Sequence, residues 1–227
     1  RTPRKLMSSG TRIVLLGRQG AGKGTQCLRL SRHYVVPHIS TGDMLRAAVR
    51  EDSALGRSVE KIIGGGGLVS DELIIEVVRE RLKKADTQQR GYILDGFPRT
   101  VVQAEALDLI AQDLPLLGAV DLVVPRDLVL SRLSARRVCR DCGANYTATG
   151  VVRSTWSCDT CGGDVVLRDD DTPDAINLRL DLYESQTAPL ISFYGQTQRL
   201  HEVDGVGSQD EVFDRITEVI DRAGGGS

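Results

Sequence analysis

The sequence predicts an α/β protein in which a parallel, five-stranded sheet is flanked by helices. Four apolar residues at positions 13–16 follow one another without alternation, which is typical of a strand buried on both faces. Further short apolar runs alternate with segments whose apolar residues share one helical face, an order typical of strand–helix–strand units. Ligands of such sheets bind at the carboxyl ends of the strands, so the residues that follow each strand are the first candidates for a functional site.

The individual elements follow from these patterns. Strands are expected at residues 13–16, 35–40, 91–95, 120–124 and 200–204, although Pro37 is unusual for a central strand. Helices are expected over 22–33, from 41, after the capping residues Ser70 and Thr100, over 127–138, and after the capping box at 208–211. Two stretches, 40–69 and 135–171, interrupt the alternation, and four glycines at 64–67 indicate a flexible break in the first.

A glycine-rich loop follows the first strand and has the spacing G-x4-G-K, from Gly17 to Lys23. Glycines let backbone N–H groups approach phosphate oxygens closely, and the next helix presents the positive end of its dipole to an anion. Lys23 would reach the outer phosphates as a point charge. The alternative is an ordinary turn with an exposed lysine, which the intact strand–loop–helix context disfavours.

An acid and an arginine follow the third strand, in the segment Asp95-Gly96-Phe97-Pro98-Arg99. Asp95 can orient magnesium or its water shell beside a phosphate loop, and Arg99 can hold a phosphate through its planar guanidinium. Alternatively, Asp95 caps local backbone and Arg99 is a solvated turn residue. The segment alone supports both interpretations about equally.

Four more arginines stand at positions compatible with phosphate binding. Arg132 and Arg136 would share one face of the helix expected over 127–138, Arg168 precedes an acidic run, and Arg179 lies on the helix after it. Each could instead be a solvated surface charge. Together with the phosphate loop they indicate a site for several phosphates, where phosphoryl transfer needs alignment and positive charge rather than covalent chemistry.

Two C-x2-C pairs, Cys139/Cys142 and Cys158/Cys161, are separated by fifteen residues. Four thiolates at this spacing predict a tetrahedral zinc site, and because four sulfurs close the coordination shell, the zinc should be structural. Two disulfides are the alternative, which a reducing compartment disfavours. Cys27 is left over and is expected to be a small packing residue.

Composition limits the class of protein further. The 227 residues are 41% hydrophobic and 26% charged, and the formal net charge of −2 predicts no general affinity for nucleic acid. No apolar run approaches the roughly 20 residues that span a bilayer, and the start lacks the apolar segment of a signal peptide. We therefore expect a cytoplasmic, monomeric protein with reduced thiols and no membrane association. Residues 1–6 and 223–227 are expected to be disordered or left over from cloning.

These motifs, in this order, resemble those of the adenylate kinase family in its bacterial long form, with a zinc-bearing lid. The resemblance covers about residues 13–220 and rests on 17–26, 40–46, 95–100, 132–138, 186–191 and the four cysteines. It implies the P-loop nucleoside monophosphate kinase fold, with a core of residues 7–39, 70–134 and 172–222. Two mobile inserts would be an AMP-binding segment at 40–69 and a zinc-binding lid at 135–171. The implied activity is Mg-dependent phosphoryl transfer between ATP and AMP, giving two ADP and serving adenine nucleotide homeostasis.

The resemblance also implies roles for individual residues. The catalytic residues would be Lys23, Arg99, Arg136, Arg168 and Arg179. ATP would be held by Gly20, Ala21, Gly22, Lys23, Gly24, Thr25, Arg132, Asn145, Tyr146 and Gly207, with Asp95 holding Mg through water. AMP would be held by Thr41, Arg46, Leu68, Val69, Gly96, Arg99, Gln103, Arg168 and Arg179. Zinc would be held by Cys139, Cys142, Cys158 and Cys161.

The sequence departs from common family choices in and near the phosphate loop. Gln19 stands where the family usually has proline, and Arg18 where it has proline or a small residue. The lid hinge, often glycine, is Ala135 here. These departures bear on the stiffness of the loop, the charge beside it and the freedom of the hinge.

Other functions are compatible with parts of the sequence. A kinase for UMP or CMP would share the phosphate-binding residues, although Gln103 and Thr41 favour AMP by family resemblance. A zinc-ribbon protein that binds nucleic acid would use the cysteines and nearby arginines, but the net charge and the aromatic content of 4% disfavour it. A non-catalytic protein with the same fold is disfavoured by the intact set of phosphate-binding charges.

Overall fold

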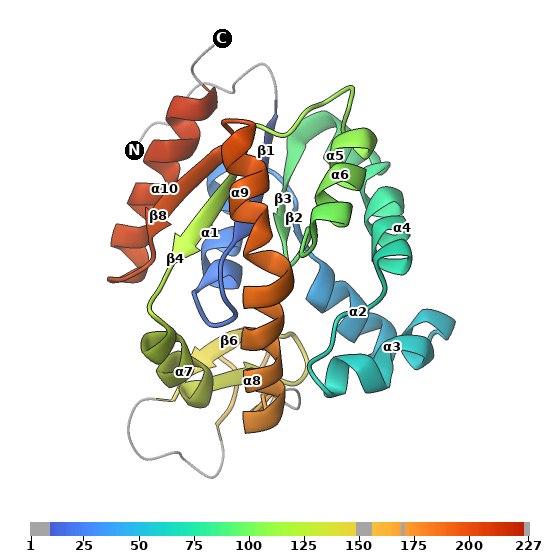
Figure 1. Ribbon diagram of the computed structural model, residues 1–227. Coiled ribbons are helices and arrows are strands. Elements are labelled where there is room, and N and C mark those ends of the chain that lie inside the picture. Colours follow the sequence, from blue (N-terminus) through green and yellow to red (C-terminus); the bar gives the residue numbers. More distant parts are fainter. Residues whose placement is uncertain (1–9, 149–155, 169–170, 225–227) are drawn as a thin grey trace.

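The computed structural model describes residues 10–148, 156–168 and 171–224. Five parallel strands form a large sheet: β1 (Thr11–Leu16), β2 (His38–Ser40), β3 (Gly91–Asp95), β4 (Gly118–Val123) and β8 (Leu200–Asp204). Their order is β2-β3-β1-β4-β8, so β1 is central (Figure 1). The predicted five-stranded parallel sheet flanked by helices is confirmed.

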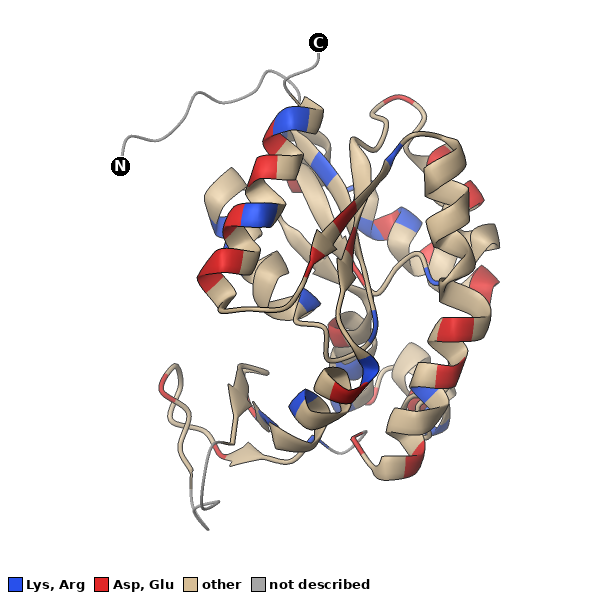
Figure 2. Ribbon diagram, turned by 60° about the vertical axis from the view of Figure 1, so that its left-hand side comes forward, with Lys and Arg blue, Asp and Glu red and all other residues tan. Residues whose placement is uncertain are grey.

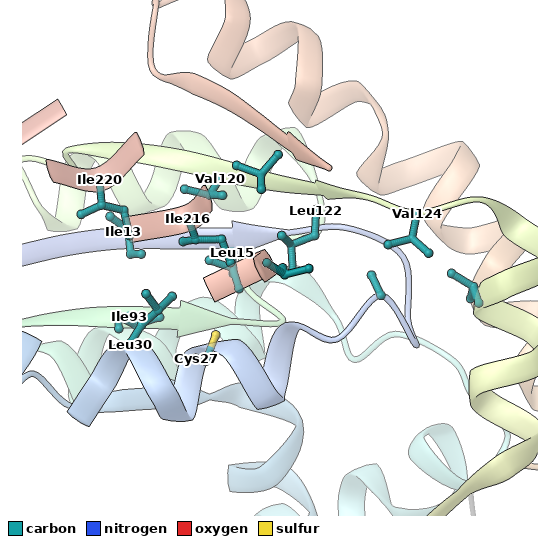
Figure 3. Packing of buried hydrophobic residues seen from close by; sticks show 14 of the residues in the cluster. Ile13, Leu15, Cys27, Leu30, Ile93, Val120, Leu122, Val124, Ile216 and Ile220 are labelled. Carbon is teal, nitrogen blue, oxygen red and sulfur yellow. The ribbon is translucent and has the colours of Figure 1, made fainter. Parts of the chain in front are cut away.

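Helices cover both faces of this sheet because consecutive residues of β1 face opposite sides. Ile13 and Leu15 join a buried cluster with α1 (Lys23–Tyr34), α7 (Arg126–Ala135), α8 (Pro173–Leu182) and α10 (Gln209–Gly224), shown in Figure 3. Val14 and Leu16 join a second cluster with α4 (Asp71–Leu82), α6 (Val101–Ile110) and α9 (Pro189–Gln196). A π-helical turn, η1 (Tyr183–Thr187), links α8 to α9, and a short α5 (Ala85–Arg90) precedes β3.

Helix starts follow the capping residues of the sequence. The Ser70 and Thr100 hydroxyls accept hydrogen bonds from backbone N–H groups in the first turns of α4 and α6. At the start of α10 the Ser208 hydroxyl accepts from the Glu211 N–H, and the Glu211 carboxylate accepts from the Ser208 N–H. These ends were predictable because a cap needs only residues three positions apart.

Two segments lie outside the main strand–helix alternation. Residues 40–69 form α2 (Thr41–Arg50) and α3 (Ala54–Gly64), and the glycine run closes α3 with hydrogen bonds back to Lys61 and Ile62. A small antiparallel sheet contains β5 (Arg136–Cys139), β6 (Asn145–Thr147) and β7 (Val165–Val166), in the order β6-β5-β7. Both segments lie beyond the carboxyl ends of the large-sheet strands (Figure 1).

Several predicted boundaries were wrong. The helix expected over 127–138 ends at Ala135, because residues 136–139 pair with β6 and β7 and tertiary pairing overrides local helical preference. Arg136 is therefore extended and does not share a helical face with Arg132. The second strand begins at His38, not at 35, since Val35 caps α1 with a left-handed φ of 57°.

The chain ends also differ in part from expectation. Ala223 and Gly224, expected in a tail, are the last residues of α10, whereas 1–6 and 225–227 lie outside the described residues. Among the described helices, none has the length and apolar character that a membrane span requires.

Candidate functional site

The phosphate loop connects β1 to α1 with a geometry that glycine makes available. Gly20 has a φ of 84°, and a Cβ there would stand 2.8 Å from the Leu133 Cγ. A larger residue would therefore be strained and would also collide with α7. Helix α1 begins at Lys23, directly after the loop, so its free N–H groups and positive dipole end face the space above the loop.

The Lys23 side chain folds over this loop. Its Nζ donates to the carbonyl oxygens of Gly17 at 2.6 Å and of Arg18 at 3.0 Å. Burial lowers the pKa of Lys23, while the neighbouring Asp95 carboxylate acts in the opposite direction. The ammonium is thus held at the point where an anion on the loop would bind.

Asp95 ends β3 beside the phosphate loop. Burial by itself raises the pKa of this carboxyl, but His38, Lys23 and Arg99 outweigh it and bring the pKa below the usual value. Asp95 is therefore ionised at neutral pH and lies in the cavity that contains Lys23. An ionised oxygen ligand at this position fits a magnesium ion or its water shell.

The segment after Asp95 forms a compact turn against α2. The Thr41 hydroxyl donates to the Gly96 carbonyl oxygen at 2.9 Å, and the Arg99 Nε donates to the same oxygen at 2.8 Å. Gly96 has a φ of 79°, and a Cβ there would lie 3.0 Å from the Thr41 hydroxyl. This close approach places Arg99, in the turn after β3, beside the first residue of α2.

Arg99 stands among other cations. Burial lowers its pKa to about 10, and the nearby Arg179, Arg46 and Arg168 lower it as well. Arg99 thus lies within electrostatic range of three other guanidinium groups, and this concentration of positive charge favours binding of an anion. Arg99 is half-buried, lines the cavity and donates to the Gly96 carbonyl oxygen, so it is not a fully solvated turn residue.

Gln103 is buried and already has protein partners. Its Oε1 accepts the Arg99 backbone N–H at 2.7 Å, and its Nε2 donates to Asp71 at 2.7 Å. Asp71 also accepts from the Thr100 hydroxyl at 3.0 Å. The amide therefore positions the Arg99 turn in addition to lining the cavity, which the sequence did not indicate.

Asp171 joins the small sheet to the phosphate loop and was missed as a functional residue. Its fully buried carboxylate accepts from the Nε of Arg136 at 2.6 Å, from a second nitrogen of Arg136, and from Arg179 at 3.4 Å. The Nε2 of Gln19 donates to it at 3.3 Å. In the sequence, Asp171 is one member of an acidic run, and nothing distinguishes it from its neighbours.

The two unusual loop residues have different environments. Gln19 lines the cavity and contacts Asp171, as described above. The Arg18 guanidinium instead pairs with Glu184 at 2.6 Å and lies over the Tyr183 ring at 5.4 Å. Arg18 is absent from the described lining of the cavity, so its charge is directed toward η1.

One cavity of about 630 Å³ collects the predicted nucleotide-binding residues. Its lining contains every residue that the sequence assigned to ATP, magnesium, AMP or catalysis: Gly20, Ala21, Gly22, Lys23, Gly24, Thr25, Thr41, Arg46, Leu68, Val69, Asp95, Gly96, Arg99, Gln103, Arg132, Arg136, Asn145, Tyr146, Arg168, Arg179 and Gly207. Figure 2 shows several basic ribbon segments between the large sheet and the small one.

The four predicted metal ligands converge in the small sheet. The sulfurs of Cys139, Cys142, Cys158 and Cys161 all lie within 4.8 Å of one another, and two pairs are separated by 3.5 Å. The Thr160 backbone N–H donates to the Cys158 sulfur at 3.3 Å. Sulfurs that coordinate one tetrahedral zinc ion stand roughly 3.8 Å from one another. The spacing of the four cysteine sulfurs therefore fits a single zinc ion.

Tyr146 connects the cysteine cluster to the cavity. Its hydroxyl donates to the Cys158 sulfur at 3.1 Å and lowers the pKa of that thiol, while its ring packs 5.3 Å from Trp156. The same residue lines the cavity. A change at the cysteines would therefore alter the contacts of a residue that lines the cavity.

The phosphate loop, the carboxylate on the neighbouring strand β3 and the arginines of the cavity lining define a phosphotransferase of the P-loop class. The comparisons make this more specific. Residues 15–199 match the family described as adenylate kinase. The adenylate kinase of Syntrophobacter fumaroxidans is 47% identical over 92% of this chain and 99% of its own length. That of Moorella thermoacetica is 50% identical over 86% and 90%, and that of Clostridium perfringens 45% over 92% and 98%. The chain belongs to the adenylate kinase family, whose members are nucleoside monophosphate kinases.

Proposed function

We propose that this enzyme catalyses reversible, Mg-dependent transfer of the terminal phosphoryl group of ATP to AMP, giving two ADP. The observation that carries the proposal is that one cavity is lined by both predicted nucleotide sites and by Arg46, Arg99, Arg132, Arg136, Arg168 and Arg179. Two anionic substrates must be brought together there, and positive charge offsets their repulsion. The enzyme would serve to balance the adenine nucleotides.

The ATP side of the reaction is assigned to the phosphate loop. Backbone N–H groups of residues 20–25 and the Lys23 ammonium would hold the β- and γ-phosphates. The Arg132 guanidinium, which donates to the carbonyl oxygens of Ala21 and Gly205, would lie along the adenine. Asn145, Tyr146 and Gly207 would border the nucleotide. Bound Mg²⁺ supplies neutralisation of phosphate charge, and Asp95 would hold it through water.

The AMP side is assigned to α2 and the Arg99 turn. Arg46 and Arg99 would hold the α-phosphate of AMP, while Thr41, Gly96 and the 68–69 backbone would enclose the nucleoside. The Gln103 amide has one N–H beyond the partners named above, which supports an additional contact with adenine. Arg136, Arg168 and Arg179 would stabilise the charge on the group in transfer.

Closure of two inserts over the substrates is part of the proposal. Segment 40–69 carries Thr41 and Arg46, and segment 135–171 carries Arg136 and Arg168, so each contributes cations to one substrate from outside the large sheet. Closing both segments would exclude water from the transferring phosphate. The Ala135 hinge would permit this motion at the junction of α7 and β5.

Zinc is assigned to the four cysteines as a structural ion. The fit of their sulfurs to a tetrahedral site supports this, and four thiolates leave no position for a substrate. The four cysteines are expected to hold one zinc ion per chain, which is released by a chelator or by denaturation. A cytoplasmic location and a monomeric state stay predictions from the sequence.

A coupled assay across AMP, UMP, CMP and GMP, each with MgATP, tests the reaction. We expect AMP to have the highest kcat/KM and to yield two ADP for each ATP consumed. Lys23→Ala protein prepared in parallel is the control, because its loss of activity shows that the wild-type activity comes from this chain and not from a contaminant. A preference for UMP or CMP, or oligonucleotide binding without phosphoryl transfer, would contradict the proposal.

A further inference from the structure

Three residues outside the cysteine cluster also have metal-ligand chemistry and lie close together. The Cys27 sulfur, the His38 imidazole and the Asp95 carboxylate have ligand atoms within 4.8 Å of one another. Cys27 is fully buried, and the His38 and Asp95 side chains are 12% and 15% exposed. Of these residues, only Asp95 has a place in the reaction proposed above.

The register of the sheet explains why these side chains meet. His38 of β2 is paired with Ile93 of β3, and Asp95 is two residues beyond Ile93. The side chains of His38, Ile93 and Asp95 therefore lie on the same face of the sheet. Helix α1 covers that face, and the Cys27 sulfur points from it toward the sheet beside Ile93 (Figure 3). Cys27 also lies four residues after Lys23, one helical turn from the phosphate loop.

The imidazole has an unsatisfied nitrogen in this place. His38 Nε2 is buried and has no hydrogen-bond partner in the part of the chain that the structure describes. The Asp95 Oδ2 is 3.7 Å away, which is too long for a hydrogen bond. Nitrogen and oxygen ligands of one tetrahedral zinc stand roughly 3.4 Å apart, so a small side-chain adjustment would suffice to bind an ion.

We propose that Cys27, His38 and Asp95 form a second zinc site beneath the phosphate loop, and that zinc bound there inhibits the enzyme. Thiolate, imidazole and carboxylate are ligands that zinc accepts, whereas magnesium requires oxygen ligands in an octahedral arrangement. Zinc binding would displace the Cys27 thiol proton to solvent, and the resulting thiolate and the Asp95 carboxylate would balance the two charges of the ion. Three protein ligands also leave a fourth position open, unlike the four-cysteine site.

Inhibition follows from the position of Asp95 and rests on the proposed function. Asp95 lines the nucleotide cavity and is assigned to the magnesium water shell. A carboxylate bound to zinc is no longer available to that shell, and the ion adds a positive charge one turn below Lys23. Zinc entering through the cavity would therefore compete with productive binding of the Mg-nucleotide.

Metal stoichiometry tests the site independently of catalysis. The full chain is equilibrated with Zn²⁺, dialysed, and its zinc content measured by elemental analysis. Cys27→Ala and His38→Gln should each hold one equivalent fewer than the wild type, whatever the four cysteines retain. His33→Gln, an exposed histidine on the same helix as Cys27, is the matched control and should keep the wild-type content. Equal zinc content in wild type, Cys27→Ala and His38→Gln would overturn the site.

Kinase assays at fixed MgATP and increasing Zn²⁺ test the consequence. Cys27→Ala should keep its turnover without zinc and need at least about tenfold more zinc for half-inhibition than the wild type. His33→Gln should be inhibited like the wild type. If Cys27→Ala holds one zinc equivalent fewer but is inhibited by the same zinc concentration as the wild type, zinc at this site does not inhibit the enzyme. Absence of kinase activity in the wild type that holds zinc only at its four cysteines would contradict the proposed function and leave the stoichiometric result standing.

Discussion

The five-stranded sheet and the three-stranded sheet both contribute to one cavity, but they bury very different amounts of apolar surface. Two clusters of eighteen buried residues each cover the faces of the large sheet. In the described part of the small sheet the cluster has three buried members, Cys139, Cys158 and Val165, with Ala144, Tyr146 and Trp156 packed partly against them. Two of those three, Cys139 and Cys158, are among the four proposed zinc ligands.

This difference shows that the two regions need different sources of stability. A fully buried leucine or isoleucine contributes about 1.5–3 kcal/mol by leaving water, so clusters of this size can hold the large sheet together. The small sheet has too few such residues, and metal binding would supply its folding free energy. The cavity between them thus combines one wall held by packing with one wall held by coordination.

Breaking the coordination should have the largest effect, confined to the small sheet. Removing metal, or Cys142→Ala, should withdraw folding free energy on the order of 10 kcal/mol from that sheet. We expect a lower thermal midpoint and faster hydrogen exchange in 136–148 and 156–168, with turnover surviving at low temperature and a higher KM for ATP. Metal content, melting and turnover are measured on one chelated sample.

Two outcomes would contradict this picture. An unchanged thermal midpoint in a metal-free sample would show that zinc does not stabilise the small sheet. Complete loss of turnover in a folded large sheet, restored only by zinc, would give the metal a role in the reaction itself.

Breaking the packing should destabilise the whole protein. Leu94, fully buried in β3, contributes to the second cluster, and Leu94→Ala should lower the free energy of unfolding by about 2–5 kcal/mol through loss of contacts and a cavity. The comparison variant Val165→Ala, in the small sheet, should cost only about 1 kcal/mol. Denaturant unfolding of both variants measures the difference, and equal losses would show that the two sheets do not differ in this way.

Charge removal separates the chemistry from the scaffold. Lys23→Ala and Arg99→Ala should each reduce turnover at least about 100-fold, because each removes a cation from the transferring or accepting phosphate. Arg18→Ala is the matched control, since its guanidinium is paired with Glu184 away from the cavity lining. Near-normal turnover in a folded Lys23→Ala or Arg99→Ala enzyme would remove that residue from the site.

The smallest effect is expected for recognition of the acceptor base. Gln103→Ala should raise the KM for AMP more than the KM for ATP, and part of the effect should come from release of the Arg99 turn. Gln103→Glu keeps the acceptor for the Arg99 N–H but places a second carboxylate beside Asp71, so it distinguishes the two contributions. Equal changes in both KM values would count against a role in AMP recognition.

Short-range patterns account for most of what could be predicted. The phosphate loop, the helix caps and the cysteine pairs each depend on residues within a few positions, and all were placed correctly relative to their strands and helices. The helix predicted through residue 138 was wrong because the pairing of Arg136–Cys139 with β6 and β7 involves residues distant in the chain. Arg136 nevertheless lines the cavity, through β5 instead of a helix.

The sequence by itself determined the fold class, the position of the glycine-rich loop and of the segment from Asp95 to Arg99 after their strands, and the four-cysteine cluster, because each depends on residues that are close in the sequence. Only the tertiary structure decided which charges are paired. Asp171 gathers Arg136, Arg179 and Gln19 from three separate elements, and nothing in an acidic run singles it out. Likewise, Cys27 and His38 meet Asp95 only because the register of β2 on β3 and the placement of α1 bring them to one face. Such contacts depend on the packing of elements that are distant in sequence, which no local pattern specifies.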